Sequence, residues 1–365
     1  MKVSFLQPTI TEEDIEEVVR VLRSGWLVLG EETKKFEKGL AEYLGVSDVI
    51  LTNSCACSLQ MLFSLLGLKE GDEVITTPLS YVSTVSPALH HGAKPVFVDV
   101  EEKTGLITPE AVEAVITDKT KMILPVHLYG QMVDMKGMKE VADKHNLLLV
   151  EDAAHAVEAE RDGVRSGALS HGGTFSFHVA KSIVTGTGGA LAVNDPDLAD
   201  KARVMRHDGV RNVGNVRRME MLGYKYLATE FQASLLSNQL KRIDSQWARR
   251  KEIYEKYSKA FDEVGIKYNQ VIPGSKHAYH MIVIWVDPSK RAEIREKLSV
   301  AGVGTSVHYD PIHLEPYYKD NFGFKEGDFP VAEKLGASTI TLPMYPSLTD
   351  EEQDYVIGQV LGCVA

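Results

Sequence analysis

The chain has 365 residues, with 40 basic and 51 acidic side chains, a net charge of -11 and 44% hydrophobic residues. This length can bury a large core and more than one domain, and the composition is ordinary for a globular protein. The acidic balance disfavours a general nucleic-acid or membrane surface, although it is compatible with a local basic pocket for an anionic substrate.

Apolar stretches and cysteines indicate the setting in which the chain works. No apolar stretch approaches about 18 residues, so no transmembrane helix is expected. The N-terminal residues lack the core of a signal peptide. Cys55, Cys57 and Cys363 show no paired CxxC spacing, so neither a disulfide framework nor a zinc site is expected. These features predict that the protein works in the reducing cytoplasm.

The chain opens with two amphipathic helices. Thr11 can cap a helix that runs to Arg23, because apolar residues recur at helical spacing from Ile15 onward, and a second helix is expected over 31–44. Short apolar runs then alternate with helical segments. The expected strands cover 49–51, 74–76, 95–98, 122–126, 147–150 and 190–193, with helices at 109–116 and 135–145 among those between them. Continuous hydrophobic runs indicate strands buried on both faces, which predicts an α/β domain with a mostly parallel sheet.

The pattern changes after residue 230. A long helix without Pro or Gly is expected from Glu230 to about Phe261, and it would lead out of the first domain. Strands are then expected at 279–286, 305–309 and 338–342, and helices at 290–301, 331–336 and 349–361. This part predicts a smaller α+β domain packed on the first. The predicted division is a large domain at 1–240, which includes the N-terminal helical segment, and a small domain at 241–365.

Asp152 and Lys181 form the most informative pair of residues. Asp152 follows a buried strand, at the edge where open α/β sheets bind ligands, although alone it could be a helix cap. Lys181 lies in a turn rich in Ser, Thr and Gly. A lone lysine is usually a solvated charge, but the surrounding amides and hydroxyls can hold a phosphate. The pair suggests a pyridoxal phosphate (PLP) site, in which the lysine forms a Schiff base and the acid pairs with the pyridinium nitrogen.

Other residues are consistent with this site. The segment 53–59 opens a helix directly after a strand, so its free amides and the helix dipole could hold an anion, or it could be an ordinary cap. Tyr81 could stack on a planar cofactor or fill the core. His155 could bond a cofactor oxygen or be a buried histidine. The remaining histidines lack metal-binding spacing, and no P-loop or dinucleotide fingerprint follows a strand.

Taken together, these blocks resemble the DegT/DnrJ/EryC1/StrS family of sugar aminotransferases, which are PLP enzymes of fold type I. The resemblance runs through almost the whole chain. Its blocks are 24–30, 52–55, 71–75, 95–99, 125–130, 151–155, 175–189, 279–280 and 342–343. Any single block would be weak, but their common order makes the match specific.

The resemblance implies a role for each matching position. Lys181 takes the place of the Schiff-base lysine, which also moves protons, and Asp152 takes that of the pyridinium partner. His155 is expected near the phenolic oxygen of the cofactor. The expected phosphate cradle and stacking ring are Ser54, Cys55, Ala56, Ser176 and Tyr81. The residues expected near the substrate are Trp26, His308 and His313.

The chain also departs from the family pattern. Thr187 replaces a common Glu, which is expected to change packing and not chemistry. Members commonly place an Asn after Gly223 that reaches the other subunit's cofactor phosphate, and this chain has none before Gln232. Lys225 could replace it as a point charge, or the contact is lost. Some relatives lack the lysine and dehydrate sugars, which the presence of Lys181 disfavours.

The resemblance implies a homodimer with shared sites that transfers an amino group from an amino acid, expected to be L-glutamate, to a nucleotide-linked keto-sugar. Ping-pong kinetics should follow. Two alternatives remain open. One is an enzyme of the same fold that acts on a non-nucleotide ketone or dehydrates a sugar. The other is a non-catalytic PLP-binding sensor, since fold alone does not settle function.

Overall fold

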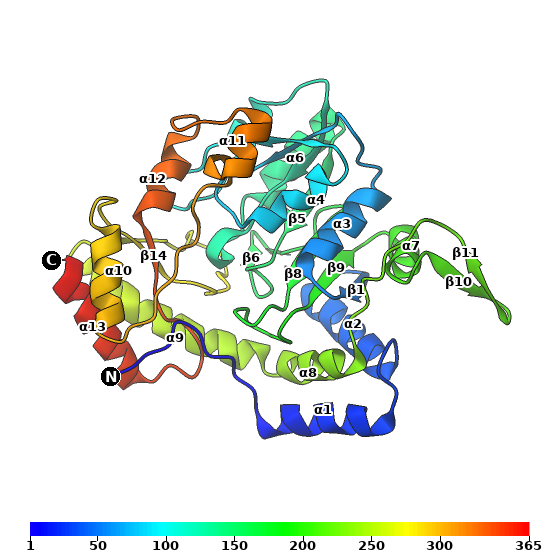
Figure 1. Ribbon diagram of the computed structural model, residues 1–365, viewed down its shortest axis with the longest axis horizontal. Coiled ribbons are helices and arrows are strands. Elements are labelled where there is room, and N and C mark those ends of the chain that lie inside the picture. Colours follow the sequence, from blue (N-terminus) through cyan, green and yellow to red (C-terminus); the bar gives the residue numbers. More distant parts are fainter. Residues whose placement is uncertain (365) are drawn as a thin grey trace.

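The computed structural model describes residues 1–364. Its centre is a seven-stranded sheet with the order β1-β9-β8-β5-β4-β2-β3 (Figure 1). In that order the strands are Asp48–Thr52, Gly189–Val193, Gly172–Ser176, Leu148–Asp152, Thr120–Leu124, Glu73–Thr76 and Lys94–Phe97. β9 runs antiparallel to both of its neighbours, whereas the other paired strands are parallel. The predicted mostly parallel sheet of an α/β fold is therefore confirmed.

Successive side chains of each strand enter different cores on the two faces of the sheet. Val49 and Leu51 of β1 belong to one core, and Ile50 belongs to the other. The first core is covered by α2 (Glu31–Leu44), α5 (Pro109–Glu113), α6 (Met135–His145) and α8 (Glu230–Leu240). The second is covered by α3 (Cys55–Leu65), α4 (Ser86–Leu89) and α7 (Pro196–Arg206). Two apolar faces are the reason that these strands read as continuous hydrophobic runs.

Strand β8 was absent from the sequence prediction. Its residues Gly172–Ser176 begin with two glycines, which have low strand propensity and no side chain to report burial. Packing requires them, because a Cβ on Gly173 would lie 2.4 Å from Cα of Gly167 and one on Gly172 would lie 2.8 Å from Leu62. The glycines of β8, the strand that leads directly to the Lys181 loop, are thus required because neighbouring residues pack closely against its backbone, and hydrophobicity does not identify this strand.

The single helix expected over 230–261 is two helices, α8 and α9 (Ile243–Asp262). Arg242 breaks the helix with φ -115° and ψ 13°. Its guanidinium reaches the fully buried carboxylate of Asp14 in α1 (Glu12–Ser24), with Nη1 3.0 Å from Oδ1. Figure 1 shows α1 lying along α8. The break therefore coincides with an ion pair that joins the N-terminal helix to the α8–α9 corner.

The C-terminal part contains a small antiparallel sheet of β12 (Lys267–Tyr268), β13 (Val283–Trp285) and β14 (Thr339–Thr341). Its helices are α10 (Arg291–Val300), α11 (Pro316–Phe322), α12 (Pro330–Ser338) and α13 (Asp350–Val364). The strand expected at 305–309 is reduced to one bridge between Ser306 and Thr341. Val3 packs into the core of this part and pairs with Val303. The division after residue 240 stays an expectation, and the first residues pack with the second part.

A hairpin of β10 (Val210–Val213) and β11 (Val216–Met219) projects from the body of the molecule (Figure 1). It carries exposed apolar side chains, with Val213 61% and Met219 67% exposed. A short two-stranded sheet of β6 (Glu160–Arg161) and β7 (Val164–Arg165) lies beyond β5 in the sequence. Among the helices of residues 1–364, none is both long enough and apolar enough to cross a membrane.

Candidate active site

Asp152 ends β5, and two donors orient its carboxylate. Thr84 Oγ1 donates a hydrogen bond of 2.7 Å to Oδ2, and the amide of Ala154 donates one of 3.1 Å to Oδ1. Thr84 also shares a 2.8 Å hydrogen bond with the hydroxyl of Ser80. Asp152 is only 5% exposed. The two donors fix the direction of the remaining carboxylate lone pairs, which can accept a further N–H.

Lys181 lies in the loop between β8 and β9 and lines the same cavity as Asp152. Burial lowers the pKa of Lys181 from 10.5 to about 8, and the nearby carboxylate of Asp152 and the thiol of Cys55 oppose this shift. An amine with this pKa has an unprotonated fraction near neutral pH. It can therefore act as a nucleophile and exchange a proton, which an ordinary surface lysine does poorly.

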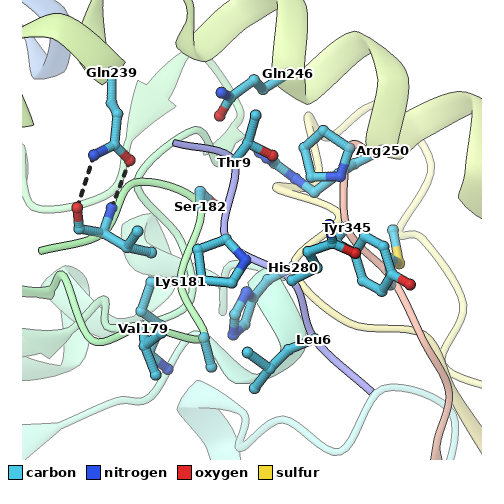
Figure 2. Close-up of a pocket in the computed structure, with 16 residues that line it drawn as sticks. Leu6, Thr9, Val179, Lys181, Ser182, Gln239, Gln246, Arg250, His280 and Tyr345 are labelled. Atoms are coloured by element: carbon cyan, nitrogen blue, oxygen red, sulfur yellow. Dashed lines mark hydrogen bonds between the residues drawn. The ribbon is translucent and has the colours of Figure 1, made fainter. Parts of the chain in front are cut away.

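Helix α8 holds the loop that carries Lys181. The side chain of Gln239 accepts a 2.9 Å hydrogen bond from the amide of Val184 and donates one of 2.7 Å to its carbonyl (Figure 2). At the start of the loop, the Lys181 amide donates to the carbonyl of His178 at 2.8 Å. The loop has no regular secondary structure, so these bonds to its backbone fix the position of Lys181.

The N-terminus of α3 forms another wall of the cavity. Ser54 caps this helix, and its hydroxyl accepts a 3.1 Å hydrogen bond from the amide of Cys57. Gly189 of β9 packs against this turn, and a Cβ there would lie 2.2 Å from the carbonyl carbon of Ser54. Burial raises the pKa of the Cys55 thiol, so this side chain is neutral. The first amides of α3, free of intrahelical partners, offer a site for an anion.

His155 of the cavity lies between Tyr129 and Tyr309. Its Nδ1 accepts a 3.3 Å hydrogen bond from the amide of Tyr129, so the proton resides on Nε2, which lies 3.2 Å from the hydroxyl of Tyr309. Burial lowers the pKa of His155 well below 6.5, and Lys181 adds to this shift. A neutral His155 is therefore a directed hydrogen-bond donor at the cavity.

These residues line one cavity of about 370 Å³. The predicted site residues that the structure brings together here are Ser54, Cys55, Ala56, Tyr81, Asp152, His155, Ser176, Lys181 and His308. His308 is oriented by a 2.8 Å hydrogen bond between its Nδ1 and the hydroxyl of Thr341. Tyr81 is 57% exposed, and the centroid of its ring lies 6.0 Å from that of Tyr309. The cavity is therefore open on the side of Tyr81.

Three predicted residues lie outside this cavity. His313 is fully buried, with Nε2 2.9 Å from Oε1 of Glu333 and its ring 4.8 Å from that of Phe329. The structure thus gives His313 a packing position and does not bring it to the substrate side of the cavity. Trp26 is 65% exposed near a separate cavity, and Lys225 pairs with Asp208 on the surface. Lys225 was expected to reach the cofactor phosphate of the other subunit, which a single chain cannot test. The predicted roles of Lys225 and Trp26 therefore stay predictions.

The sequence analysis missed several residues that the cavity contains. Thr84 and Ser80 belong to the hydroxyl-rich segment around Tyr81, and this composition was the available signal. Tyr309 directly follows the predicted His308, but only the fold directs its hydroxyl to His155. His178 and Met281 also line the cavity, as does Thr187, which was expected only to change packing. Their types carry no chemical pattern that could have identified them.

PLP fits this set of groups. Asp152 has oriented lone pairs for a ring nitrogen, and Lys181 has an amine of lowered pKa for an aldehyde carbon. The first turn of α3 and Ser176 offer donors for a phosphate. The close packing of Gly189 on Ser54 leaves this cradle free of side chains from β9. Fold and site together define a PLP enzyme of fold type I.

Comparison with known proteins agrees with the assignment of a PLP enzyme. Residues 8–361 match the DegT/DnrJ/EryC1/StrS aminotransferase family. The chain is 39% identical to the spore coat polysaccharide biosynthesis protein SpsC of Bacillus subtilis (98% and 96% of the two chains covered), and 32% identical to the GDP-perosamine synthase of Caulobacter vibrioides (98% and 97%). The PLP form of Spr1654 from Streptococcus pneumoniae superimposes with a TM-score of 0.95 at 30% identity, covering 100% of this chain and 99% of that one.

The chain belongs to the DegT/DnrJ/EryC1/StrS aminotransferase family. It is a PLP-dependent aminotransferase, as the resemblance of its sequence blocks implied.

Proposed function

We propose that this enzyme transfers an amino group from L-glutamate to a nucleotide-linked keto-sugar in the synthesis of a polysaccharide. The observation that carries the proposal is the convergence of Lys181 and Asp152 on one cavity that also contains the α3 N-terminus. The relatives support the acceptor class, because one is named a GDP-perosamine synthase and another a polysaccharide biosynthesis protein. Two half-reactions, one for the donor and one for the acceptor, should give ping-pong kinetics.

Each residue has a part in this reaction. When bound, PLP supplies an electron-withdrawing ring that stabilises negative charge beside the amine nitrogen. Asp152 would accept a hydrogen bond from the ring nitrogen and would keep that nitrogen positively charged. Lys181 Nζ would take a proton from the donor's α-carbon, and in the second half-reaction it would deliver a proton to the sugar carbon that receives the amine. His155 Nε2 would donate a hydrogen bond to the phenolic oxygen of the cofactor, and Tyr81 would stack on its ring.

We also propose that the enzyme is a homodimer with shared sites that works in the cytoplasm. The cavity is open beside the exposed ring of Tyr81, and the projecting hairpin carries the exposed apolar residues Val213 and Met219. A second subunit would cover these surfaces and bring Lys225 toward the partner's cofactor phosphate. Mass determination in solution tests the dimer, and weaker PLP binding in Lys225→Ala tests the contact. The three free cysteines are compatible with a reducing compartment.

An absorbance spectrum of the PLP-loaded protein, before and after addition of L-glutamate without sugar, tests the donor half. Conversion to the spectrum of the aminated cofactor supports the proposal. A spectrum unchanged by any amino acid favours dehydration or a binding protein without catalysis. Product analysis with nucleotide-linked keto-sugars then tests the acceptor half. Amination of a free ketone in preference to the nucleotide-linked one would contradict the acceptor class.

A further inference from the structure

A second cavity, of about 40 Å³, lies beside Lys181 (Figure 2). It shares Ala180 and Lys181 with the cofactor cavity, so the two cavities adjoin at these residues. Its remaining walls come from other residues of the Lys181 loop and from five further parts of the chain: the N-terminal segment 6–9, Gln239 of α8, α9, His280 and the loop 344–346. We call this space the Arg250 chamber.

Arg250 of α9 is the cation of the chamber. It is 3% exposed, and its Nη2 forms an ion pair with the fully buried carboxylate of Glu158. Within residues 1–364, the Nε and Nη1 atoms of Arg250 have no hydrogen-bond partner. Glu158 also accepts a 3.2 Å hydrogen bond from the hydroxyl of Ser182, the residue after Lys181. The guanidinium is thus held from one side and retains free donors.

Two other unpartnered polar atoms line the same chamber. In the described part of the chain, Oγ1 of Thr9 and Nε2 of His280 also have no hydrogen-bond partner. Burial lowers the pKa of His280 well below 6.5, and the charges of Lys181 and Arg250 contribute, so this imidazole is neutral. Buried donors left without partners cost about 1–3 kcal/mol each, which favours a polar occupant over an apolar one.

Charge and size indicate what the occupant is. Arg250 is paired with one buried carboxylate, Glu158, through Nη2 alone, so its Nε and Nη1 can still bind an anionic group. The volume corresponds to a few water-sized groups, since one water occupies roughly 10–15 Å³ by the same measure. A carboxylate has this size and accepts the in-plane N–H donors of arginine, whereas a phosphate on a nucleotide is larger.

We propose that the Arg250 chamber binds the side-chain carboxylate of the amino donor, and that Arg250 thereby selects a dicarboxylic donor. The proposal rests on the proposed function, because it concerns the donor half of the same site. Arg250 supplies the free guanidinium donors, Thr9 supplies a hydroxyl, and Lys181 joins the chamber to the reacting centre. A monocarboxylic amino acid of small size would leave these donors unpaired.

The test uses the PLP-loaded enzyme and glutarate, a dicarboxylate that has no amine to react. Its dissociation constant is measured by calorimetry for the wild type and for Arg250→Lys, which retains the charge beside Glu158. Loss of charged hydrogen bonds should raise the constant about tenfold or more. Arg249→Lys is the matched control, because Arg249 is the adjacent arginine of α9 and pairs with Asp350 at 2.7 Å on the surface. It should bind glutarate like the wild type.

A second variant, Thr9→Val, tests the chamber with less risk of disturbing the fold than a change at the buried Arg250. Thr9→Val removes one hydroxyl at nearly constant volume and should raise the glutarate constant by about threefold to tenfold. The KM for L-glutamate in the donor half-reaction should rise in parallel, with the rate for L-alanine unchanged. The proposal is wrong if the wild-type enzyme has no affinity for glutarate, or if both variants bind glutarate like the wild type. Either result would indicate that ordered water fills the chamber. Failure of every amino acid to react would instead overturn the proposed function.

Discussion

Thr84 Oγ1 donates a 2.7 Å hydrogen bond to Asp152 Oδ2, although 68 positions separate the two residues in the sequence. Thr84 lies in the 3-10 turn Val82–Thr84 after β2, and Asp152 ends β5. The two strands flank β4 in the parallel sheet, so their carboxyl ends meet at one edge. The direction of the carboxylate thus depends on a residue from another crossover.

Removal of the Thr84 hydroxyl should weaken cofactor binding. In Thr84→Val the carboxylate of Asp152 loses one of its two donors and can turn away from the ring nitrogen. A hydrogen bond to a charged group contributes about 1.5–3 kcal/mol, so the PLP dissociation constant should rise about tenfold or more. Fluorescence titration of the cofactor-free protein measures this. Thr84→Ser keeps the hydroxyl and should bind PLP nearly as well as the wild type.

Replacement of Lys181 should abolish multiple turnover. Lys181→Ala removes both the nucleophile and the group that moves protons, and general acid–base catalysis alone contributes about 10²–10⁴-fold. Steady-state amino transfer should therefore fall at least about a thousandfold. Lys201→Ala, in which an exposed lysine of α7 is removed, is the control and should retain full activity. Turnover by Lys181→Ala at more than a small fraction of the wild-type rate would contradict the assigned role.

Capture of PLP should depend on pH through Lys181. Only the unprotonated amine reacts, and the pKa of Lys181 is lowered from 10.5 to about 8. The rate of cofactor incorporation into the cofactor-free protein should rise with pH and reach half of its plateau near pH 8. Stopped-flow absorbance measures this profile. A midpoint close to 10.5, the ordinary lysine value, would show that burial does not act on the amine.

The same profile tests the neighbouring carboxylate. The charge of Asp152 raises the pKa of Lys181 and so opposes the effect of burial. Asp152→Asn removes this charge, so the midpoint should move to lower pH, even though PLP binds less tightly. A midpoint displaced to higher pH would mean that the interaction has the opposite sign.

Gly189 should not tolerate a side chain. In Gly189→Ala the new Cβ would lie 2.2 Å from the carbonyl carbon of Ser54 and 2.3 Å from the amide nitrogen of Cys55, so the cradle must shift. Overpacking of this kind costs about 1–3 kcal/mol, and PLP binding should fall with the melting temperature. Gly358→Ala in α13 is the control, since no atom lies within 4 Å of its Cβ position. That variant should be stabilised, by up to about 1 kcal/mol.

Sequence patterns predicted the parts of the fold that depend on local hydrophobicity and capping. Helix α2 has the predicted ends, Glu31 and Leu44, and Thr11 caps α1 as expected. The strand β8 was not predicted because its glycines are required by close contacts with Gly167 and Leu62 and not by a hydrophobic pattern. Only the folded structure shows these contacts. The break at Arg242 escaped prediction for the same reason, since its partner Asp14 lies in another helix.

The sequence by itself determined the sheet class and the family and proposed roles for Lys181 and Asp152, because ordered blocks and strand-end positions are local properties of the chain. Tertiary structure decided which other groups act with them. It directs Thr84 to the carboxylate and Tyr309 to His155, and it removes His313 into a packing position. It also assembles the Arg250 chamber from segments that lie far apart in the sequence. The physical reason is that hydrogen bonds, burial and lowered pKa values depend on distances between remote residues, which no local pattern encodes.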